Sequence, residues 1–190
     1  MEKRLDLRIQ KTYHALTDTF LALLCEKKFE EITVNEICEK ALVRRATFYK
    51  HFGDKYELMT FVVKQQLNLF KDKSIQSNII RFSEDYYLSI FGMILDFIDQ
   101  NIPLINSLKN SNVFPVISAT ITEELFIMMK EIFKEDAQKG KDFILPYDVM
   151  ARVFVGIVLS IGGYWVQKNN DIGKDEMLEN FRILTKRMYG

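Results

Sequence analysis

The stretch from Thr33 to Lys55, TVNEICEKALVRRATFYKHFGDK, constrains this chain most, because it contains the signals for two short helices joined by a tight turn. Thr33 followed by Glu36 forms a capping box, in which each side chain can bond a free backbone N–H at a helix start. Apolar residues then recur at spacings of three and four, namely Val34, Ile37, Cys38 and Ala41. This pattern predicts a helix over 33–41 with one buried face.

The second helix, predicted over 45–51, has a different outer surface. Val43, Phe48 and Phe52 can face inward together, so we expect both phenylalanines in the core. The other positions carry side chains that can all donate hydrogen bonds, namely Arg44, Arg45, Thr47, Tyr49, Lys50 and His51. Donors on an exposed helix suit the phosphate oxygens and base edges of a DNA major groove. A surface Arg or Lys is usually just solvated, so it is the helical context that favours a binding role.

Two helices joined by a short turn, the second exposed and rich in donors, make a helix-turn-helix. The segment resembles the DNA-binding domain of the TetR/AcrR family of transcriptional regulators, and the helix around Ile9 to Leu24 fits as well. The matching positions are Thr33, Val34, Ile37, Ala41, Val43, Thr47, Tyr49, His51, Phe52 and Lys55. The resemblance implies phosphate contacts from Thr33, Thr47, Tyr49, His51 and Lys55. It implies base reading by Arg45 and Lys50, with Arg44 as a further candidate.

Two positions depart from the family pattern. Leu42 stands where the family commonly has Gly in the turn, which costs roughly 1 to 2 kcal/mol if the backbone there is left-handed. Arg44 stands where the family often has a Ser that caps the second helix. The cap must then come from elsewhere or be missing, at a cost of about 0.5 to 2 kcal/mol.

Positive charge is concentrated in one local patch, whereas the chain as a whole is neutral. Lys and Arg number 26, as do Asp and Glu, so the formal net charge is zero. Residues 1–58 contain 11 basic and 10 acidic side chains, a net +1, which leaves 15 and 16, a net −1, for the rest. The stretch from Arg44 to Lys55 holds five basic residues, His51 included, against one acid, Asp54. We expect modest non-specific DNA affinity with a shallow salt dependence.

The composition, 48% hydrophobic and 27% charged, is that of a well-packed soluble protein. Cys25 and Cys38 lack metal-type spacing, and we expect both to be buried, reduced thiols. His14 and His51 are too few and too far apart in sequence to suggest a metal site. The charged start predicts no signal peptide. The uncharged apolar run Val153 to Val166, 14 residues, is shorter than the roughly 20 that span a bilayer. We therefore expect a cytoplasmic protein without a cofactor.

Apolar spacing and helix start signals predict helices along the whole chain, and the alternation typical of strands is rare. The predicted helices cover 7–26, 33–41, 45–51, 55–72, 83–100, 103–109, 114–137, 147–168 and 174–188. We expect an all-α fold of about nine helices, the usual number in the TetR/AcrR family. A three-helix helix-turn-helix DNA-binding domain is placed at 1–58. The helix 55–72 links it to a C-terminal bundle for effector binding and dimerisation at 59–190.

The last two predicted helices indicate a tight contact. Gly156, Gly162 and Gly163 lie inside helix 147–168, where each costs about 1 kcal/mol relative to Ala, so we expect another backbone to approach closely. In the TetR/AcrR family the final two helices pair across a two-fold axis, and the resemblance implies a homodimer that matches a palindromic operator. The interface candidates are Phe154, Ile157, Ile161, Trp165, Phe181 and Leu184. The alternative is that these side chains fill the core of one subunit.

The middle helices carry many aromatic and Met side chains, most of which we expect in the core. A bundle lined by such side chains can also hold a small apolar or aromatic molecule, which is where TetR-type proteins take their inducers. The candidate pocket residues are Tyr87, Phe91, Phe126 and Met129. The C-terminal third, with its Tyr164–Trp165 pair, also resembles regulators of dihydroxyacetone-kinase operons, in which the effector can be a protein.

The leading hypothesis is a homodimeric repressor that binds operator DNA and is released by an effector bound in the C-terminal domain. The alternative keeps the same fold but acts mainly through a protein partner, as a co-activator or interaction module. An enzyme is disfavoured, because no nucleophile cluster, phosphate loop or metal spacing occurs in the sequence.

Overall fold

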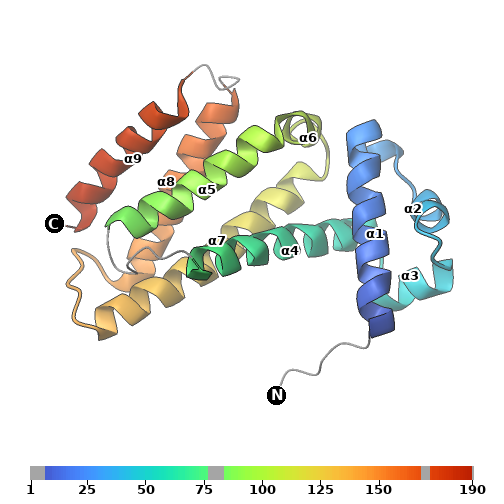
Figure 1. Cartoon of the computed structure of the whole chain (residues 1–190), viewed down its shortest axis with the longest axis horizontal. Helices are drawn as coiled ribbons and strands as arrows, with labels where there is room; N and C mark the ends of the chain where they lie inside the picture. The colour runs from blue at the N-terminus through green and yellow to red at the C-terminus, as the bar shows by residue number, and fades with distance from the viewer. Residues whose placement is uncertain (1–6, 77–83, 168–171, 190) are drawn as a thin grey trace. The chain divides into compact units, whose positions relative to one another are not determined.

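The computed structural model describes residues 7–76, 84–167 and 172–189, and every regular element in these ranges is a helix (Figure 1). The elements are α1 (Leu7–Glu26), the 3-10 turn η1 (Phe29–Glu31), α2 (Val34–Lys40), α3 (Arg45–His51), α4 (Lys55–Gln76), α5 (Glu84–Gln100), α6 (Ile102–Leu108), α7 (Phe114–Gln138), α8 (Tyr147–Gln167) and α9 (Lys174–Tyr189). The predicted all-α fold is confirmed. The helix ends agree with the predicted ranges to about one residue, except that α4 continues to Gln76; η1 was not predicted.

The chain packs as two compact units. The first contains Met1–Val63 and Pro103–Ser118, and the second contains Lys64–Ile102 and Ala119–Gly190. The helix α4 contributes to both units, and the boundary expected after residue 58 lies within this same helix. Most of α6 and the turn after it belong with the first unit, although they follow α5 in sequence.

The core of the first unit includes the three helices that precede α4, together with Leu58, Met59 and Val62 at the start of α4. Figure 1 shows α1, α2 and α3 grouped together, and α2 packs against both α1 and α3. Fully buried side chains include Leu16, Phe20, Leu23, Ile37 and Phe48. Phe52 is also buried, so the prediction that both phenylalanines of the helix-turn-helix lie in the core is confirmed.

The two cysteines differ in exposure. Cys38 is buried on the inner face of α2, and burial raises the pKa of its thiol above the ordinary value. Cys25 is exposed, so the expectation of two buried thiols was wrong for this residue. The physical reason is the helix face: Leu24 turns into the core, and the next position on α1 turns outward.

The second unit is held together by aromatic packing of α5 against α8 and α9, which lie beside it in Figure 1. Phe91 stacks on Phe181 with ring centroids 4.2 Å apart, and Phe154 meets Phe181 edge-on at 5.6 Å. The Trp165 side chain donates from Nε1 to the Ile172 carbonyl at 2.8 Å. Three predicted interface residues, Phe154, Trp165 and Phe181, therefore fill the core of their own unit.

The helix α8 is longer than the uncharged segment seen in the sequence. It has 21 residues, and an 18-residue window of mean hydropathy 1.8 makes it long and apolar enough to cross a membrane by length and composition. The uncharged run is still 14 residues; the longer window meets the criterion because it also includes Arg152. One face of α8 is nevertheless buried within the second unit, as in a core helix of a bundle; its residues are Met150, Ala151, Phe154, Val155, Val158, Gly162 and Trp165.

Candidate nucleic-acid interface

The turn between α2 and α3 is built by backbone hydrogen bonds. Thr33 caps α2 by accepting a bond from the Glu36 N–H at 3.2 Å. At the other end, the Val43 N–H donates to the Cys38 carbonyl at 2.9 Å, and the Leu42 N–H donates to the Glu39 carbonyl at 3.2 Å. These two bonds form a Schellman motif, which requires a left-handed residue after the helix. Leu42 occupies that position with a φ of 55°.

Leu42→Gly is therefore expected to stabilise the protein by about 0.5 to 1 kcal/mol, because glycine adopts the left-handed conformation without the steric cost, offset in part by its greater freedom when unfolded. Little packing is lost, since the Leu42 side chain is 94% exposed. Urea unfolding measures the change. Leu42→Ala is the control: it also removes the exposed side chain but keeps Cβ, and it should leave the free energy of unfolding nearly unchanged. An equal gain in both variants would contradict the backbone explanation.

The helix α3 begins without a side-chain cap. Arg44 is the N-cap residue, in an extended conformation with φ −67° and ψ 140°, and its side chain makes no capping hydrogen bond. The sequence left two alternatives, a cap from elsewhere and a missing cap, and the structure shows that the N-cap residue itself does not supply one. The Arg44 side chain is exposed instead, which adds a cation at the start of the helix.

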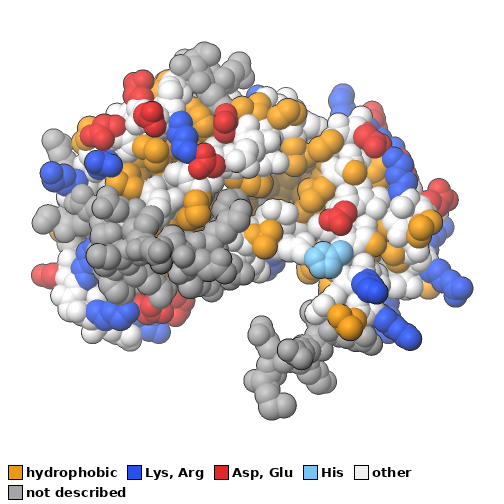
Figure 2. Space-filling view, viewed as in Figure 1, with side chains coloured by type: hydrophobic (Ala, Val, Ile, Leu, Met, Phe, Trp, Pro, Cys, Tyr) orange, Lys and Arg blue, Asp and Glu red, His pale blue; other side chains and the backbone are white. Residues whose placement is uncertain are grey.

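The outer face of α3 is exposed and basic. Arg44, Arg45 and Lys50 are exposed, and among the described residues none of the three has an ion-pair partner. Figure 2 shows Lys and Arg side chains on the surface of the part that contains α2 and α3. Unpaired cations on an exposed helix keep their full capacity for phosphate and base contacts, because no internal carboxylate must first be displaced.

The nearby acids are neutralised by other cations. Glu36 receives a hydrogen bond from Lys27 at 2.6 Å, and this bond is the main reason that the pKa of Glu36 is lowered. Glu26 pairs with Lys40 at 2.8 Å, and that hydrogen bond raises the pKa of the Lys40 ammonium. Glu26 and Glu36 are therefore paired with cations outside α3.

The predicted phosphate contacts are less uniform in exposure. Thr33 is exposed at the start of α2, Tyr49 is 50% exposed on α3, and Thr47 is half-buried. His51 is half-buried at the end of α3, where its ring meets that of Tyr13 edge-on at 5.1 Å. Thr47, Tyr49 and His51 thus lie on α3 and Thr33 caps α2, and their contacts with DNA remain a prediction.

Lys55 makes contacts inside the protein. Its Nζ donates to the carbonyls of Phe29 at 2.7 Å, Ile32 at 2.7 Å and Glu30 at 3.2 Å, and lies 4.4 Å from the centre of the Phe29 ring. An ammonium has three N–H bonds, and these carbonyls use all of them. Desolvation lowers the pKa of Lys55, opposed by the charge of Glu30. Lys55 thus ties the start of α4 to η1 in place of presenting a free cation to solvent.

Glu30 joins η1 to the turn between α6 and α7. Its Oε1 accepts from the Ser111 hydroxyl at 2.7 Å and from the Asn112 N–H at 2.8 Å. The Ser111 bond is the largest cause of the lowered pKa of Glu30, followed by the Asn112 bond. The Tyr56 hydroxyl also donates to Asn112 Oδ1 at 3.2 Å. The α6–α7 turn is therefore held to the helix-turn-helix part of the first unit.

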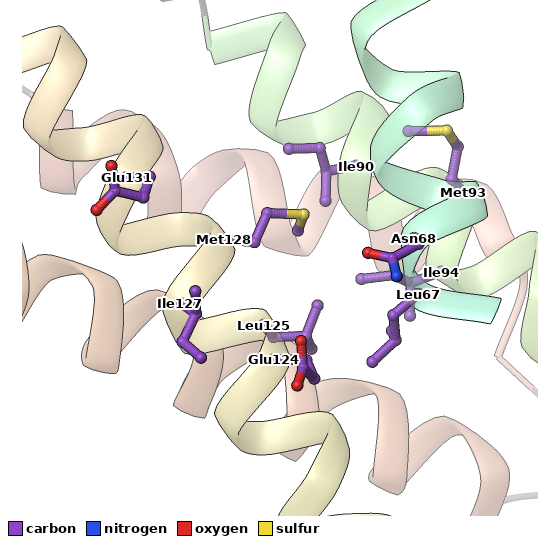
Figure 3. Close-up of a pocket in the computed structure, with 10 residues that line it drawn as sticks. All are labelled: Leu67, Asn68, Ile90, Met93, Ile94, Glu124, Leu125, Ile127, Met128 and Glu131. Carbon is purple, nitrogen blue, oxygen red and sulfur yellow. The ribbon is translucent and has the colours of Figure 1, made fainter. Parts of the chain in front are cut away.

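The second unit contains a small hollow between α4, α5 and α7, with a volume of about 90 Å³. Figure 3 shows that side chains from all three helices surround it. The lining residues are Leu67, Asn68, Ile90, Met93, Ile94, Glu124, Leu125, Ile127, Met128 and Glu131. At the edge, Glu124 pairs with Lys64 at 2.7 Å. The hollow is mainly apolar, and it is smaller than the roughly 300 Å³ at which drug-sized sites begin.

The four predicted pocket residues lie elsewhere. Tyr87 and Phe91 are fully buried in the aromatic core, and Met129, 1% exposed, lines a smaller space that shares Ile90 and Met128 with the hollow. Phe126 is half-buried with the Arg152 guanidinium 4.1 Å from its ring centre. Sequence periodicity identified apolar positions, but it could not distinguish a core position from a wall of a hollow.

Two contacts of the first unit were missed by sequence reasoning. The Tyr13–His51 and Glu30–Asn112 pairs join positions far apart in the chain, and no local pattern marks them. Within the described ranges, no group of three His, Cys, Asp or Glu side chains is placed to hold a metal ion.

Comparison with known proteins places the helix-turn-helix part in a family. Residues 11–60 match the family model described as "Bacterial regulatory proteins, tetR family". The uncharacterized HTH-type transcriptional regulator YxbF of Bacillus subtilis is 32% identical over 110 residues, which cover 57% of this chain and 29% of that protein. The chain thus spans less than a third of this relative.

Solved structures resemble the fold over nearly the whole chain. A TetR-family transcriptional regulator from Syntrophomonas wolfei superposes with a TM-score of 0.72 at 16% identity, covering 93% of this chain and 94% of that one. The dihydroxyacetone kinase operon activator DhaS superposes with a TM-score of 0.60 at 17% identity, covering 94% and 98%. At these identities the similarity shows the fold alone.

Proposed function

We propose that this protein is a DNA-binding transcriptional regulator of the TetR family, whose model residues 11–60 match, and that it acts in the cytoplasm as a homodimeric repressor. The recognition helix is α3, which enters the major groove of a half-site. Arg45 and Lys50 read base edges, with Arg44 beside them at the helix entrance. Thr33, Thr47, Tyr49 and His51 hold the phosphates.

One observation carries this proposal: the cations of α3 are exposed and have no ion-pair partner among the described residues, while Glu26 and Glu36 are paired with other lysines. A helix packed through Phe48 and open on its other side is suited to bind a duplex. Neither the net charge of zero nor the net +1 of residues 1–58 opposes this, because phosphate contacts depend on local charge.

The dimer interface is proposed along the exposed stripe of α8. Gly156, Ser160 and Gly163 lie on this stripe, and a Cβ added at Gly156 or Gly163 would have no neighbouring atom within 4 Å among the described residues. Small residues at spacings of four and three allow a second helix to approach closely. Ile157 and Ile161 are half-buried beside them, and Leu184 on α9 is 43% exposed. We therefore still propose Ile157, Ile161 and Leu184, which were predicted from the sequence, as interface residues.

Gly156→Leu is expected to weaken the dimer at least tenfold, because a leucine side chain in a close helix contact forces the two backbones apart. Sedimentation equilibrium measures the dissociation constant. The monomer should not be destabilised, since the position is open and leucine has the higher helix propensity. Gly156→Ala adds only a methyl group at the same position, so it should weaken the dimer less than Gly156→Leu does. A dimer of unchanged affinity in both variants would place the interface elsewhere.

We propose that the effector enters the hollow between α4, α5 and α7. This hollow takes the place of the pocket predicted from the sequence at four other residues. Its wall is mainly apolar, which suits a small apolar or aromatic group once the hollow widens. The helix α7 runs unbroken from Phe114, two residues after Asn112, to Gln138, and carries five of the wall residues. An effector that displaces α7 can thereby act on the bonds of Glu30 and shift the population away from the DNA-binding state.

Selection of bound fragments from random double-stranded DNA tests the proposed function. The expected result is an enriched palindrome whose half-sites lie about 34 to 36 Å apart or further, matching two α3 helices related by a two-fold axis. Recovery of no shared sequence after repeated rounds, with a protein shown to be folded by circular dichroism, would overturn the assignment.

A further inference from the structure

Tyr13 on α1 lies against the last residue of α3. Its hydroxyl oxygen is 3.4 Å from Nδ1 of His51, and the two rings meet edge to face with centroids 5.1 Å apart at an angle of 73°. The contact spans 38 positions of sequence, so it exists only because α1 packs near the end of α3. Neither the family pattern nor the helical spacing had assigned a role to Tyr13.

The Tyr13 ring is itself held in place. It packs against Phe61 with centroids 4.9 Å apart and against the buried Phe52 at 5.6 Å. A hydroxyl on a ring packed in this way has little freedom to leave the histidine. The half-buried Tyr13 therefore offers a hydrogen-bonding group at a defined place beside His51.

The contact occupies Nδ1 of His51 and leaves Nε2 for a ligand, and the direction of the Tyr13 bond decides whether Nε2 carries a proton or a lone pair. A neutral imidazole has one N–H and one lone pair, and the hydrogen bond at one nitrogen sets the role of the other. When Tyr13 donates its O–H to Nδ1, the proton of the neutral ring must lie on Nε2. When the ring is cationic, both nitrogens carry protons, and the tyrosine oxygen accepts from Nδ1–H. In both of these states Nε2 is a donor. If the neutral ring instead donated Nδ1–H to the tyrosine oxygen, Nε2 would carry the lone pair, so the direction of the bond determines the role of Nε2.

A phosphate oxygen can accept hydrogen bonds but cannot donate them, so it requires Nε2–H and is repelled by an Nε2 lone pair. We propose that Tyr13 is a positioning residue for DNA binding: it bonds Nδ1 of His51 and so orients the Nε2–H toward a backbone phosphate. This inference rests on the proposed DNA-binding function and adds to it a residue of α1. Preorganisation of this kind reduces the ordering cost of the contact.

The first test is Tyr13→Phe in the free protein, with the side-chain nitrogen spectrum of His51 recorded above about pH 8, where an ordinary histidine is neutral. The wild type is expected to show a single tautomer with the proton on Nε2 and a hydrogen-bonded Nδ1. The variant should shift toward the tautomer mixture of a solvated histidine. His14, exposed on α1, is the internal reference, and unchanged His51 signals would overturn the proposal without any DNA being present.

The second test measures affinity for the selected operator by fluorescence anisotropy. Tyr13→Phe should weaken binding about threefold to tenfold, the effect of one hydrogen bond. His51→Ala should weaken it at least as much. In the double variant, Tyr13→Phe should have no further effect, because Tyr13 acts through His51. Additive losses would show that Tyr13 acts by another route and would overturn the proposal.

Tyr56→Phe is the matched control. Tyr56 is also half-buried in the first unit, packs edge-on against Phe29 at 4.9 Å, and donates its hydroxyl to Asn112 away from α3. The variant Tyr56→Phe should therefore leave the nitrogen spectrum of His51 unchanged. If Tyr13→Phe changes the spectrum but not the affinity, while alanine at Arg45 and Lys50 weakens binding, the positioning role is overturned and the DNA-binding function stands. If no α3 variant changes affinity, the proposed function itself fails.

Discussion

Replacement of both Arg45 and Lys50 by alanine is expected to weaken operator binding by roughly 10² to 10⁴-fold, since each base contact of this kind contributes about 1 to 3 kcal/mol. Both side chains are exposed on α3 and neither is used in an ion pair within the described part of the chain. The loss should be larger for the selected operator than for unrelated DNA, because base contacts discriminate between sequences while phosphate contacts do not. Anisotropy titration with the two duplexes measures both effects.

The charge-matched control replaces Lys109 and Arg182 by alanine. Both are exposed, Lys109 follows α6 and Arg182 lies on α9, and their removal changes the net charge by the same two units. This control should shift affinity only slightly, through the long-range field. If the control weakens binding as much as the α3 variant, general electrostatics and not α3 would explain the affinity.

Lys55→Met should lower the free energy of unfolding by about 2 to 4 kcal/mol. The variant removes three hydrogen bonds from an ammonium, each of the charge-assisted kind worth about 1.5 to 3 kcal/mol, and the relief of ammonium desolvation offsets part of that sum. The carbonyls of Phe29 and Ile32 lose their donor, and the contact with the Phe29 ring is lost as well. Urea unfolding followed by circular dichroism measures the change.

Lys64→Met, on the same helix, separates this effect from a general loss of positive charge. Lys64 is 50% exposed in its side chain and pairs with Glu124 at the surface, a contact worth about 1 kcal/mol or less. A small change at Lys64 and a large one at Lys55 would support the structural role of Lys55. Equal small changes would show that the contacts with η1 contribute little, and Lys55 would return to the set of free phosphate-binding cations.

The helices of this protein could be predicted almost to the residue, because the signals that start and stop a helix are local. The Thr33 cap and the Asp54 cap, whose Oδ1 accepts from the Tyr56 and Glu57 N–H groups, each act over two or three residues. The spacing of Val34, Ile37 and Cys38 likewise depends on one helical turn. The left-handed Leu42 was also foreseeable, since the geometry of a short helix-helix turn is set by its own backbone bonds.

The exposed side of α3 followed from the sequence for a similar reason. Once Phe48 is turned inward, the helical period places Arg45 and Lys50 outside. In α8 the same reasoning reached its limit, because apolar residues occupy all sides of the helix. Phe154 and Trp165 were indistinguishable from Ile157 as interface candidates. In the folded unit Phe154 meets Tyr87 of α5 and Phe181 of α9, Trp165 bonds the Ile172 carbonyl, and both side chains are buried.

Contacts between distant parts of the chain could be read only from the folded molecule. Lys55 looked like one more cation of the α3 region, yet the carbonyls that surround it lie 23 to 26 positions earlier. Glu30 meets Asn112 across 82 positions, and Tyr13 meets His51 across 38. A residue's type and its neighbours along the chain specify which helix it joins and which side of that helix it occupies. What that side chain touches depends on how the helices pack, and packing is a property of the whole chain.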